Sequence, residues 1–431
     1  MCMQIKLPYS TTGMMLHLED DLDVEVLASS IESMPKSDKT EDEIVLEAME
    51  NPIGSPKLSE LSRGKEKVVI ICSDHTRPVP SRHIIPFMLK EIREGNPDAK
   101  ITLLIATGFH RATTREELIG KFGEEIVDRE HIVVHDSQDM DAMVNMGVLP
   151  SGAPLLINKV AAEADLLVSE GFIETHFFAG FSGGRKSVLP GVSSKVTVLG
   201  NHCSKFIHSP YSRTGILENN PIHKDMVAAS QMAGQRYIVN VIIDGDKKVV
   251  HAVAGDAIKA HEAGCAFLEN YCQVTPQRRA DIAISTNGGY PLDQNVYQCV
   301  KGMTAAEACV RPGGVIVLCA ALGDGHGGEA FYRWFAERSS AEQVTRDIES
   351  IPAAQTRMDQ WEAQILARVM HKAECIFVTG EENRELIETM HMRWAPNVDA
   401  ALCMARERLG ADASVTVIPD GVGVIVREGE A

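Results

Sequence analysis

Three histidines and one lysine of this chain lie in short segments that could carry chemistry. His110 stands in Gly-Phe-His-Arg, His176 in Glu-Thr-His and His202 in Asn-His, while Lys186 closes Gly-Gly-Arg-Lys. Two histidines can act as an acid and base pair, a third can bind a metal, and a lysine beside paired glycines can carry a cofactor. Each segment follows an apolar run typical of a strand. The set therefore indicates a site at strand ends.

Apolar, β-branched runs alternate with helix-like segments along most of the chain. Strands are expected at 67–72, 101–106, 131–134, 165–169, 237–243, 248–254, 281–285, 315–322, 375–379 and 414–418, and helices at 82–93, 113–119, 195–206, 223–233, 257–271, 292–309, 329–337, 360–371 and 398–409. This alternation predicts an α/β fold with mostly parallel sheets covered by helices. Parallel sheets bind ligands outside the carboxyl ends of their strands, where the segments above are expected.

The length and one polar segment suggest two domains. At 431 residues the chain is too long for one ordinary core. A stretch with Pro, Gln and two Arg at 273–279 is the expected boundary. We therefore predict an N-terminal α/β domain at 1–272 and a C-terminal α/β domain at 273–431.

Charge and cysteine usage narrow the classes of function. A net charge of −18 argues against a general nucleic-acid binder or a ligand of anionic membranes. The sequence has no apolar run of about 18 residues and no signal-peptide core at its start. Its 10 cysteines form no C-x-x-C pair, which is typical of free, mostly buried thiols in a cytoplasmic protein. An anionic substrate would need local basic residues.

The segment 73–78, Ser-Asp-His-Thr-Arg-Pro, follows the strand at 67–72 and is expected to open a helix. Asp74 or Thr76 could simply cap that helix. This does not explain Arg77, because the dipole at a helix N-terminus disfavours a cation. The alternative is an anion site, in which helix amides and hydroxyls hold a phosphate and Arg77 forks onto a carboxylate.

The remaining segments have a functional and a structural interpretation each. His110 and His176 follow strands of one expected sheet and could face a substrate from opposite sides, although a lone histidine is more often structural. Three glycines and three aromatic residues at 177–186 could bring backbone close to a ligand and exclude water, or form a mobile loop. Gln294, Gln298 and Lys301 share one face of the helix expected at 292–309, which could also be only a solvated face.

Taken together, these residues resemble the nickel-pincer lactate racemase family. The resemblance is carried in order by 74–78 (Asp-His-Thr-Arg-Pro), 108–111 (Gly-Phe-His-Arg), 171–176 (Gly-Phe-Ile-Glu-Thr-His), 183–186 (Gly-Gly-Arg-Lys), 200–202 (Gly-Asn-His), 297–301 (Tyr-Gln-Cys-Val-Lys) and 360–362 (Gln-Trp-Glu). It implies a two-domain α/β enzyme with its active site in the interdomain cleft. It also implies an isomerase that inverts C2 of a 2-hydroxy acid, with lactate as the default substrate.

The resemblance further implies a cofactor, a nicotinic-acid-derived mononucleotide whose two sulfur arms hold nickel as a pincer. In the family it is tethered through a thioamide to the lysine matching Lys186, and the histidine matching His202 completes the nickel coordination. The other residues matching the cofactor site are Asp74, Thr76, Arg77 and Gly184. Proteins that synthesise the cofactor are implied as transient partners.

The same resemblance assigns the substrate site. His110 and His176 match the two acid/base histidines. The carboxylate is held by residues matching Arg77, Gln298 and Lys301, and the pocket is lined by residues matching Tyr297 and Trp361.

The chemistry agrees with these residue types. The α-hydrogen of a 2-hydroxy carboxylate is a very poor acid, so direct abstraction by a histidine is unattractive. Removal of the hydroxyl proton with departure of a hydride gives a 2-keto acid instead, and return to the other face inverts the centre. Two rival interpretations stay open: a zinc hydrolase or lyase with the three histidines as ligands, and a non-catalytic binding protein. The histidines lack the i, i+4 spacing of helix-borne zinc sites.

Overall fold

The computed structural model describes residues 2–19, 22–34 and 38–427, which form two compact units. Unit 1 comprises Met1–Ser30, Cys203–Pro210 and Tyr271–Ala431, and unit 2 comprises Ile31–His202 and Tyr211–Asn270. Each contains a six-stranded sheet, and the predicted α/β fold with mostly parallel sheets is confirmed. The division of the chain is not the linear one expected at 272/273, because the first 30 residues and the segment 203–210 group with the C-terminal half.

The sheet of unit 2 has the strand order β13-β12-β9-β4-β5-β6. All its neighbours are parallel except the edge pair β12 and β13. Following the chain from β4, strands β5 and β6 lie on one side of β4, and the next strands, β9 and β12, lie on its other side. The order of the strands therefore reverses between β4 and β9. In such sheets the crevice at the carboxyl ends of those two strands is the place for a ligand. The bounds are β4 Lys67–Ser73, β5 Lys100–Ala106, β6 His131–Val134, β9 Leu166–Phe172, β12 Gln235–Ile243 and β13 Val249–Asp256.

The strands of this sheet have apolar residues on both faces, so both faces must be covered. Val68, Ile70 and Cys72 of β4 join one buried cluster with Met88 and Ile92 of α3. Threonine capping boxes fix where α1 and α4 begin, at Thr40 and Thr114. The helices of this unit are α1 Glu41–Glu50, α2 Leu58–Leu61, α3 Ile85–Gly95, α4 Arg115–Phe122, α5 Glu124–Arg129, α6 Lys159–Ala162, α7 Lys195–Asn201, α9 Pro221–Met232 and α10 Lys259–Cys272, whose end enters unit 1.

Two predictions about helices in this region were wrong. No helix opens at 74–78: residues 75–77 form a turn and a bend, and a 3-10 turn at Ser81–His83 precedes α3, since Pro78 and Pro80 disfavour helical backbone in the residue before each of them. The helix expected at 195–206 is two helices, α7 and α8 (Ser204–His208), interrupted at His202 and Cys203. Two small antiparallel pairs were not predicted, β7 Met143–Val148 with β8 Pro154–Asn158, and β10 Thr175–His176 with β11 Gly180–Phe181.

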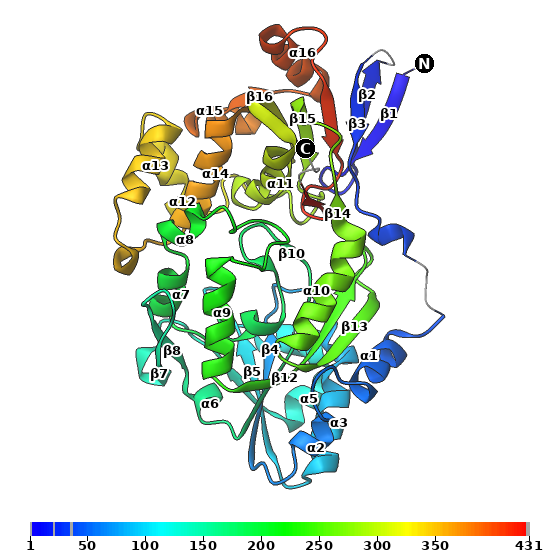
Figure 1. Ribbon diagram of the computed structural model, residues 1–431, viewed down its shortest axis with the longest axis vertical. Coiled ribbons are helices and arrows are strands. Elements are labelled where there is room, and N and C mark those ends of the chain that lie inside the picture. The colour runs from blue at the N-terminus through cyan, green and yellow to red at the C-terminus, as the bar shows by residue number, and fades with distance from the viewer. Residues whose placement is uncertain (1, 20–21, 35–37, 428–431) are drawn as a thin grey trace. The chain divides into compact units, whose positions relative to one another are not determined.

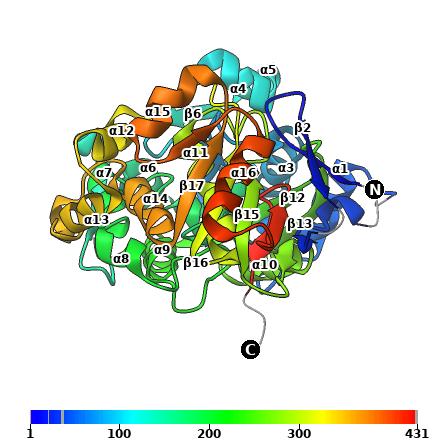
Figure 2. The same ribbon diagram turned by 90° about the horizontal axis from the view of Figure 1, so that it is seen from above.

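The sheet of unit 1 is parallel throughout, in the order β18-β17-β16-β15-β19-β3. One face, with Ile282, Ile284 and Val317, packs against α16 and the hairpin β1–β2. Helices α11 and α14 contact β15, β16 and β17, as Figure 2 shows from above. The strands are β1 Cys2–Leu7, β2 Met14–Glu19, β3 Val24–Val26, β14 Gln273–Val274, β15 Ala280–Thr286, β16 Val310–Cys319, β17 Ala373–Val378, β18 Arg393–Ala395, β19 Val415–Ile418 and β20 Ile425–Val426. The remaining helices are α11 Val296–Cys309, α12 Glu329–Ala336, α13 Ala341–Glu349, α14 Gln360–Lys372, α15 Arg384–Thr389 and α16 Val398–Leu409.

The blue N-terminal strands and the red C-terminal segment of the ribbon belong to the same unit (Figure 1). β3 pairs in parallel with β19, Val24 standing opposite Val415. Together with the apolar hairpin residues Leu7, Leu16 and Leu18, this makes the hairpin β1–β2 and strand β3 part of unit 1 and its core.

Most described cysteines are buried, as predicted. Free buried thiols include Cys72, Cys299, Cys319 and Cys375, whereas Cys403 is free and exposed. Burial raises the pKa of the Cys319 thiol to about 12, so it stays protonated and unreactive at neutral pH. A search of the described residues finds no helix that combines the length and the apolar character needed to cross a bilayer.

Candidate active site

His110 is anchored by a carboxylate at the carboxyl end of the sheet in unit 2. Its Nδ1 lies 2.7 Å from Oδ2 of Asp74, which is 1% exposed, whereas the His110 side chain is 40% exposed. Burial alone would raise the pKa of Asp74, but hydrogen bonds from His110 and Thr76 and the charge of Arg77 outweigh it and lower the pKa. The carboxylate therefore accepts the Nδ1 proton of His110. Nε2 of the neutral ring then carries the lone pair of a base.

Thr76 and Arg77 lie in the exposed loop that follows β4. The amide and hydroxyl of Thr76 both donate to Oδ1 of Asp74, at 3.2 and 2.8 Å, so Asp74 organises its own loop rather than capping a helix. Lys121 donates to the carbonyl oxygens of Arg77 and Val79, at 3.3 and 3.4 Å. Asp74 and Lys121 thus hold the loop from two sides. The loop has no helix N-terminus, although the anion-site interpretation assumed one.

Glu170 at the end of β9 is a site residue that the sequence reasoning missed. Its Oε1 accepts from the amide and hydroxyl of Ser73, at 2.9 and 2.8 Å, and from the hydroxyl of Ser81 at 3.1 Å. Glu170 is 2% exposed. It joins β9 to both ends of the loop that carries Asp74, at the point where strand order reverses. A glutamate directly after an apolar strand was the available signal.

His176 has the opposite hydrogen-bond pattern from His110. Its Nδ1 accepts the backbone N–H of Ala179 at 3.3 Å, so the neutral ring carries its proton on Nε2. The ring stacks on Phe177 with centroids 5.2 Å apart and meets the edge of Phe178 at 4.5 Å. The aromatic residues of the glycine-rich segment thus orient a histidine, which the sequence did not predict.

Phe178 is the common neighbour of three predicted site residues. Its ring lies 5.9 Å from Nζ of Lys186 and 5.2 Å, centroid to centroid, from His202, in addition to its contact with His176. The ring itself is only 4% exposed. The structure therefore brings the predicted tether, metal ligand and second acid/base group together around one buried aromatic ring.

His202, the predicted metal ligand, is a buried residue whose ring is held by the backbone. It ends α7, and its Nδ1 donates to the carbonyl of Val198 at 3.1 Å. Burial, assisted by the charge of Lys186, lowers the pKa of His202 to about 3. The ring is neutral at physiological pH with its lone pair on Nε2, and a backbone carbonyl fixes its orientation. This is the arrangement that metal-binding histidines have.

The segment that carries Lys186 is held by the buried Arg185. Its guanidinium, 1% exposed, donates to the carbonyl of Ala179 at 2.8 Å and to Nδ1 of His223 at 3.0 Å, and lies 2.9 Å from Nε2 of His261. Sequence reasoning did not single out these groups, because an arginine next to glycines resembles a surface loop.

Gly184, predicted to approach the cofactor, is explained by packing. Its φ is +51°, and a Cβ there would lie 2.7 Å from the ring of His261. Its amide donates to Oδ1 of Asn240 at 2.7 Å. Glycine is therefore required by the protein itself at this position.

The substrate residues predicted in the C-terminal half lie on two packed helices of unit 1. Gln298 and Lys301 lie on α11, where Nζ of Lys301 donates to Oε1 of Gln298 at 2.7 Å. Trp361 lies in the first turn of α14 and is 6% exposed. Gln294 is not on the helix face as predicted, since α11 begins at Val296 behind the cap Asn295.

Tyr297, the fourth predicted residue, is half-buried on the same helix. Its hydroxyl donates to Oδ1 of Asp359 at 3.4 Å, and its ring meets the edge of Phe331 with centroids 5.3 Å apart. Burial raises the pKa of Tyr297 well above its usual value, so the hydroxyl keeps its proton and stays a donor.

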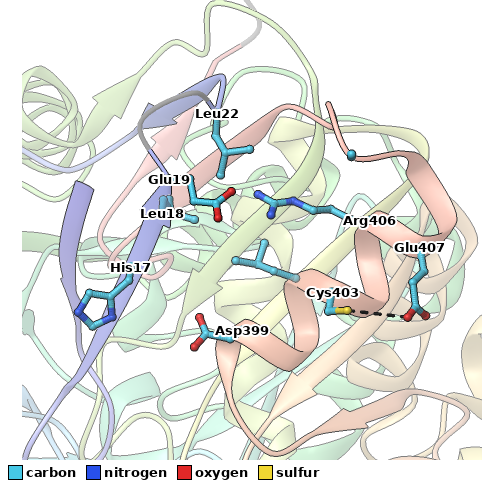
Figure 3. Close-up of a pocket in the computed structure, with 10 residues that line it drawn as sticks. His17, Leu18, Glu19, Leu22, Asp399, Cys403, Arg406 and Glu407 are labelled. Atoms are coloured by element: carbon cyan, nitrogen blue, oxygen red, sulfur yellow. Dashed lines mark hydrogen bonds between the residues drawn. The ribbon is translucent and has the colours of Figure 1, made fainter. Parts of the chain in front are cut away.

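A separate pocket of about 510 Å³ lies between β2 and α16. Figure 3 shows the guanidinium of Arg406 pointing across it toward Glu19, with Asp399 and Cys403 on the helix side. The predicted site residues are elsewhere in the fold. Among residues 2–19, 22–34 and 38–427, no three His, Cys, Asp or Glu side chains form a ready metal-binding cluster.

The chain matches two family models along its length. Residues 9–215 match the lactate racemase N-terminal domain and residues 275–426 the lactate racemase C-terminal domain. It is 52% identical to the lactate racemase of Thermoanaerobacterium thermosaccharolyticum over 98% of this chain and 99% of that protein. The chain belongs to the lactate racemase family. It is also 51% identical to the lactate racemase of Lactiplantibacillus plantarum over 98% of this chain and 99% of that protein.

Solved structures agree with this membership. The lactate racemase apoprotein from Thermoanaerobacterium thermosaccharolyticum superposes with a TM-score of 0.95 and 51% identity, covering 99% of this chain and all of that one. A protein from Thermotoga maritima, 18% identical, shares the fold alone with a TM-score of 0.65 over 92% of this chain and all of that one. The predicted family and the predicted class, an isomerase, are both confirmed by the lactate racemase relatives.

Proposed function

We propose that this protein is a lactate racemase that inverts C2 of its substrate by coupled proton and hydride transfer through a 2-keto acid. The observation that carries the proposal is the opposite proton placement in His110 and His176. Asp74 leaves His110 with a basic Nε2, while the amide of Ala179 leaves His176 with a protonated Nε2. In their neutral forms His110 thus offers a lone pair and His176 an N–H group at Nε2, and inversion needs one ring as a base and the other, after protonation to the imidazolium, as an acid.

We propose that His202 and Lys186 hold a nickel-pincer nucleotide in unit 2. When bound, that group supplies an acceptor and donor for the hydride of C2. The residues fit it: a neutral, buried imidazole with one anchored nitrogen is a suitable ligand for nickel, and Lys186 shares its aromatic neighbour Phe178. Asp74, Thr76, Arg77 and Gly184 remain proposed as parts of its surroundings.

In the proposed reaction, Nε2 of His110 takes the hydroxyl proton of one enantiomer. His176, once it carries a second proton as an imidazolium, gives a proton from Nε2 to the oxygen when the other enantiomer forms, because a neutral imidazole is far too weak an acid for this step. Asp74 stabilises the imidazolium that His110 becomes, since an ionised carboxylate lies 2.7 Å from Nδ1. The roles reverse in the opposite direction, because a racemase must handle both enantiomers.

Substrate recognition is proposed for Arg77, Gln298 and Lys301, which would hold the carboxylate. Tyr297 and Trp361 would line the pocket and exclude water. The bound partners of the protein would be a small 2-hydroxy carboxylate and, transiently, proteins that make the cofactor. Lactate is the proposed substrate, and cytoplasm the proposed location.

The proposal is tested by metal analysis, intact mass and a substrate panel. Protein produced together with the cofactor pathway should contain nickel and an adduct on Lys186, and should racemise one enantiomer of lactate from a panel of 2-hydroxy acids followed by chiral chromatography. Lys186→Ala should lose the adduct and the activity. The exposed Lys224→Ala is the matched control and should keep both. An active Lys186→Ala protein, or unchanged chirality of every acid with the loaded wild type, would overturn the assignment.

A further inference from the structure

Glu362 is a buried carboxyl group that no step of the proposed reaction uses. It lies in the first turn of α14, is 1% exposed, and its Oε1 has no hydrogen-bond partner among the described residues. Leaving a carboxylate oxygen unsatisfied in the interior is costly, so proteins rarely keep one without a reason. A buried group of this kind is retained where its charge is needed.

The cation that acts on Glu362 is Lys301. Helices α11 and α14 pack against each other, and Lys301 is the positively charged group whose electrostatic interaction favours the ionised form of Glu362. Gln298 holds the ammonium of Lys301 through its Oε1 at 2.7 Å. The half-buried Lys301 and the buried Glu362 thus belong to one polar cluster within unit 1.

The other ionisable groups facing this cluster are Asp359 and Tyr297. Asp359 has the left-handed φ of +60°, which a non-glycine residue adopts only at a cost, and its carboxylate receives the Tyr297 hydroxyl instead of capping α14. Several charged groups of the neighbouring helices are paired with one another, in His208–Glu349 of α8 and α13, Arg333–Glu329 of α12, Arg338–Asp347 and His371–Glu342. Glu362 is therefore governed by Lys301 and Asp359.

These surroundings make the proton on Glu362 responsive to the charge of Lys301. Burial raises the pKa of Glu362 well above its usual value, Lys301 lowers it, and Asp359 raises it further. If another anion takes up the charge of Lys301, the influence of Lys301 that opposes burial is weakened and the pKa of Glu362 rises again. Glu362 then holds its proton at a higher pH than before.

We propose that Glu362 is the internal counter-ion of Lys301, which yields Lys301 to the incoming substrate carboxylate and takes one proton from solvent as it does so. Glu362 is a positioning residue in this scheme, since it acts through Lys301. The exchange keeps one negative charge beside Lys301 in both states, so the cluster is never left with an unpaired buried ion. The inference rests on the proposed role of Lys301 in binding the substrate.

The sign of the pH dependence follows. Because the complex holds a proton that the free enzyme releases more readily, substrate binding weakens as pH rises between the two pKa values of Glu362. KM for lactate should rise by up to about tenfold per pH unit in that interval. Glu362→Gln keeps the shape and removes the proton, so its KM should be flat over the same interval.

The first measurement does not depend on catalysis. Infrared spectra of the purified protein at increasing pH should contain the C=O band of a protonated buried carboxyl, identified by its absence in Glu362→Gln. In Lys301→Met the band should persist to higher pH than in wild type, because the stabilising cation is gone. Identical titration of the band in both proteins would overturn the counter-ion relation, whatever the enzyme does.

The second measurement uses the loaded enzyme and L-lactate. Calorimetry in two buffers of different ionisation enthalpy should show uptake of up to about one proton on binding for wild type and none for Glu362→Gln. Glu307→Gln is the matched control, because Glu307 is a carboxylate of α11 already paired with Arg368 at 2.7 Å. It should keep the wild-type proton uptake and pH profile.

The two proposals fail in different ways. If the infrared titration responds to Lys301→Met but lactate neither binds nor changes chirality, the proposed function falls and the counter-ion pair remains. If lactate binds and is racemised while Glu362→Gln has the same proton uptake and KM profile as wild type, the counter-ion exchange is wrong.

Discussion

Three histidines of unit 2 occupy two contrasting environments. His110 is partly exposed and bound to the ionised Asp74, whereas His223 and His261 are packed around the buried guanidinium of Arg185. Burial, with Arg185 as the next cause, lowers the pKa of His223 to about 3 and that of His261 well below its usual value. The ionised Asp74 can stabilise positive charge on the ring of His110, whereas burial, followed by the charge of Arg185, keeps His223 and His261 neutral. Burial and the charge of the neighbouring group therefore distinguish these histidines, although the residue type is the same.

The largest effect should come from removing the ring next to the carboxylate. His110→Ala is expected to lower kcat for racemisation by about 10²- to 10⁴-fold, with a small change in KM, because a general base is lost and the carboxylate-binding groups remain. Chiral chromatography in both directions measures it. His208→Ala, on a side chain that is 72% exposed, is the control and should retain full activity. A variant of His110 with near-normal kcat would remove the distinction between the two environments.

A smaller loss should follow when the carboxylate is changed and the ring is kept. Asp74→Asn cannot stabilise the imidazolium and no longer fixes the tautomer of His110, so kcat should fall by about 10- to 100-fold. Since the folded-state pKa of Asp74 is lowered, wild-type support for His110 is present above pH 3.8 and is lost only as pH falls through that lowered pKa. If the racemisation rate of the wild type falls at acid pH above 3.8, protonation of Asp74 should therefore not be the cause. Asp128→Asn, on a surface pair with Arg115, should leave kcat unchanged.

The smallest effect concerns His223, which burial and Arg185 keep neutral. It appears in the free energy of unfolding rather than in activity. The folded-state pKa of His223 is depressed to about 3 from 6.5, so the unfolded chain binds a proton that the folded protein does not. The free energy of unfolding should therefore fall as pH drops from 6.5 toward 3, by at most about 1.4 kcal/mol per pH unit from this ring. His223→Asn keeps an acceptor for Arg185 and should reduce that slope in urea unfolding at a series of pH values. The exposed His131→Asn should not, and equal slopes for both variants would contradict the assignment.

Strand positions and strand ends could be predicted because they depend on local apolar patterns. The runs at 67–72 and 101–106 correspond to β4 and β5, and the candidate histidines follow strands as expected. The start of α3 could not be placed, because Pro78 is equally compatible with a helix start and with an extended loop. His202 was placed inside a helix, although it ends α7, since nothing in its immediate sequence marks the break.

The contacts that give each site residue its properties could not be predicted from the sequence. Asp74 and His110 are 36 positions apart, and their pairing depends on the adjacency of β4 and β5. Phe178 was read as a shield against water, whereas its ring organises Lys186, His176 and His202. Arg185 and Glu362 carry charges usually found at the surface, and only tertiary packing shows that both are buried. Residue types identified the chemistry, and long-range contacts determined the protonation states.

The pairing of β3 with β19 has a consequence for the synthesis of the protein. Strands β1, β2 and β3 are synthesised before the rest of unit 1. Val24 of β3 can pair with Val415 only after β19 has been synthesised. Until then Leu7, Leu16 and Leu18 have no core to enter, because that core is built from the last third of the sequence. Contacts so distant in sequence form late and slowly. Unit 2 can therefore complete its sheet before β19 is made, whereas the sheet of unit 1 cannot be completed until β19 pairs with β3.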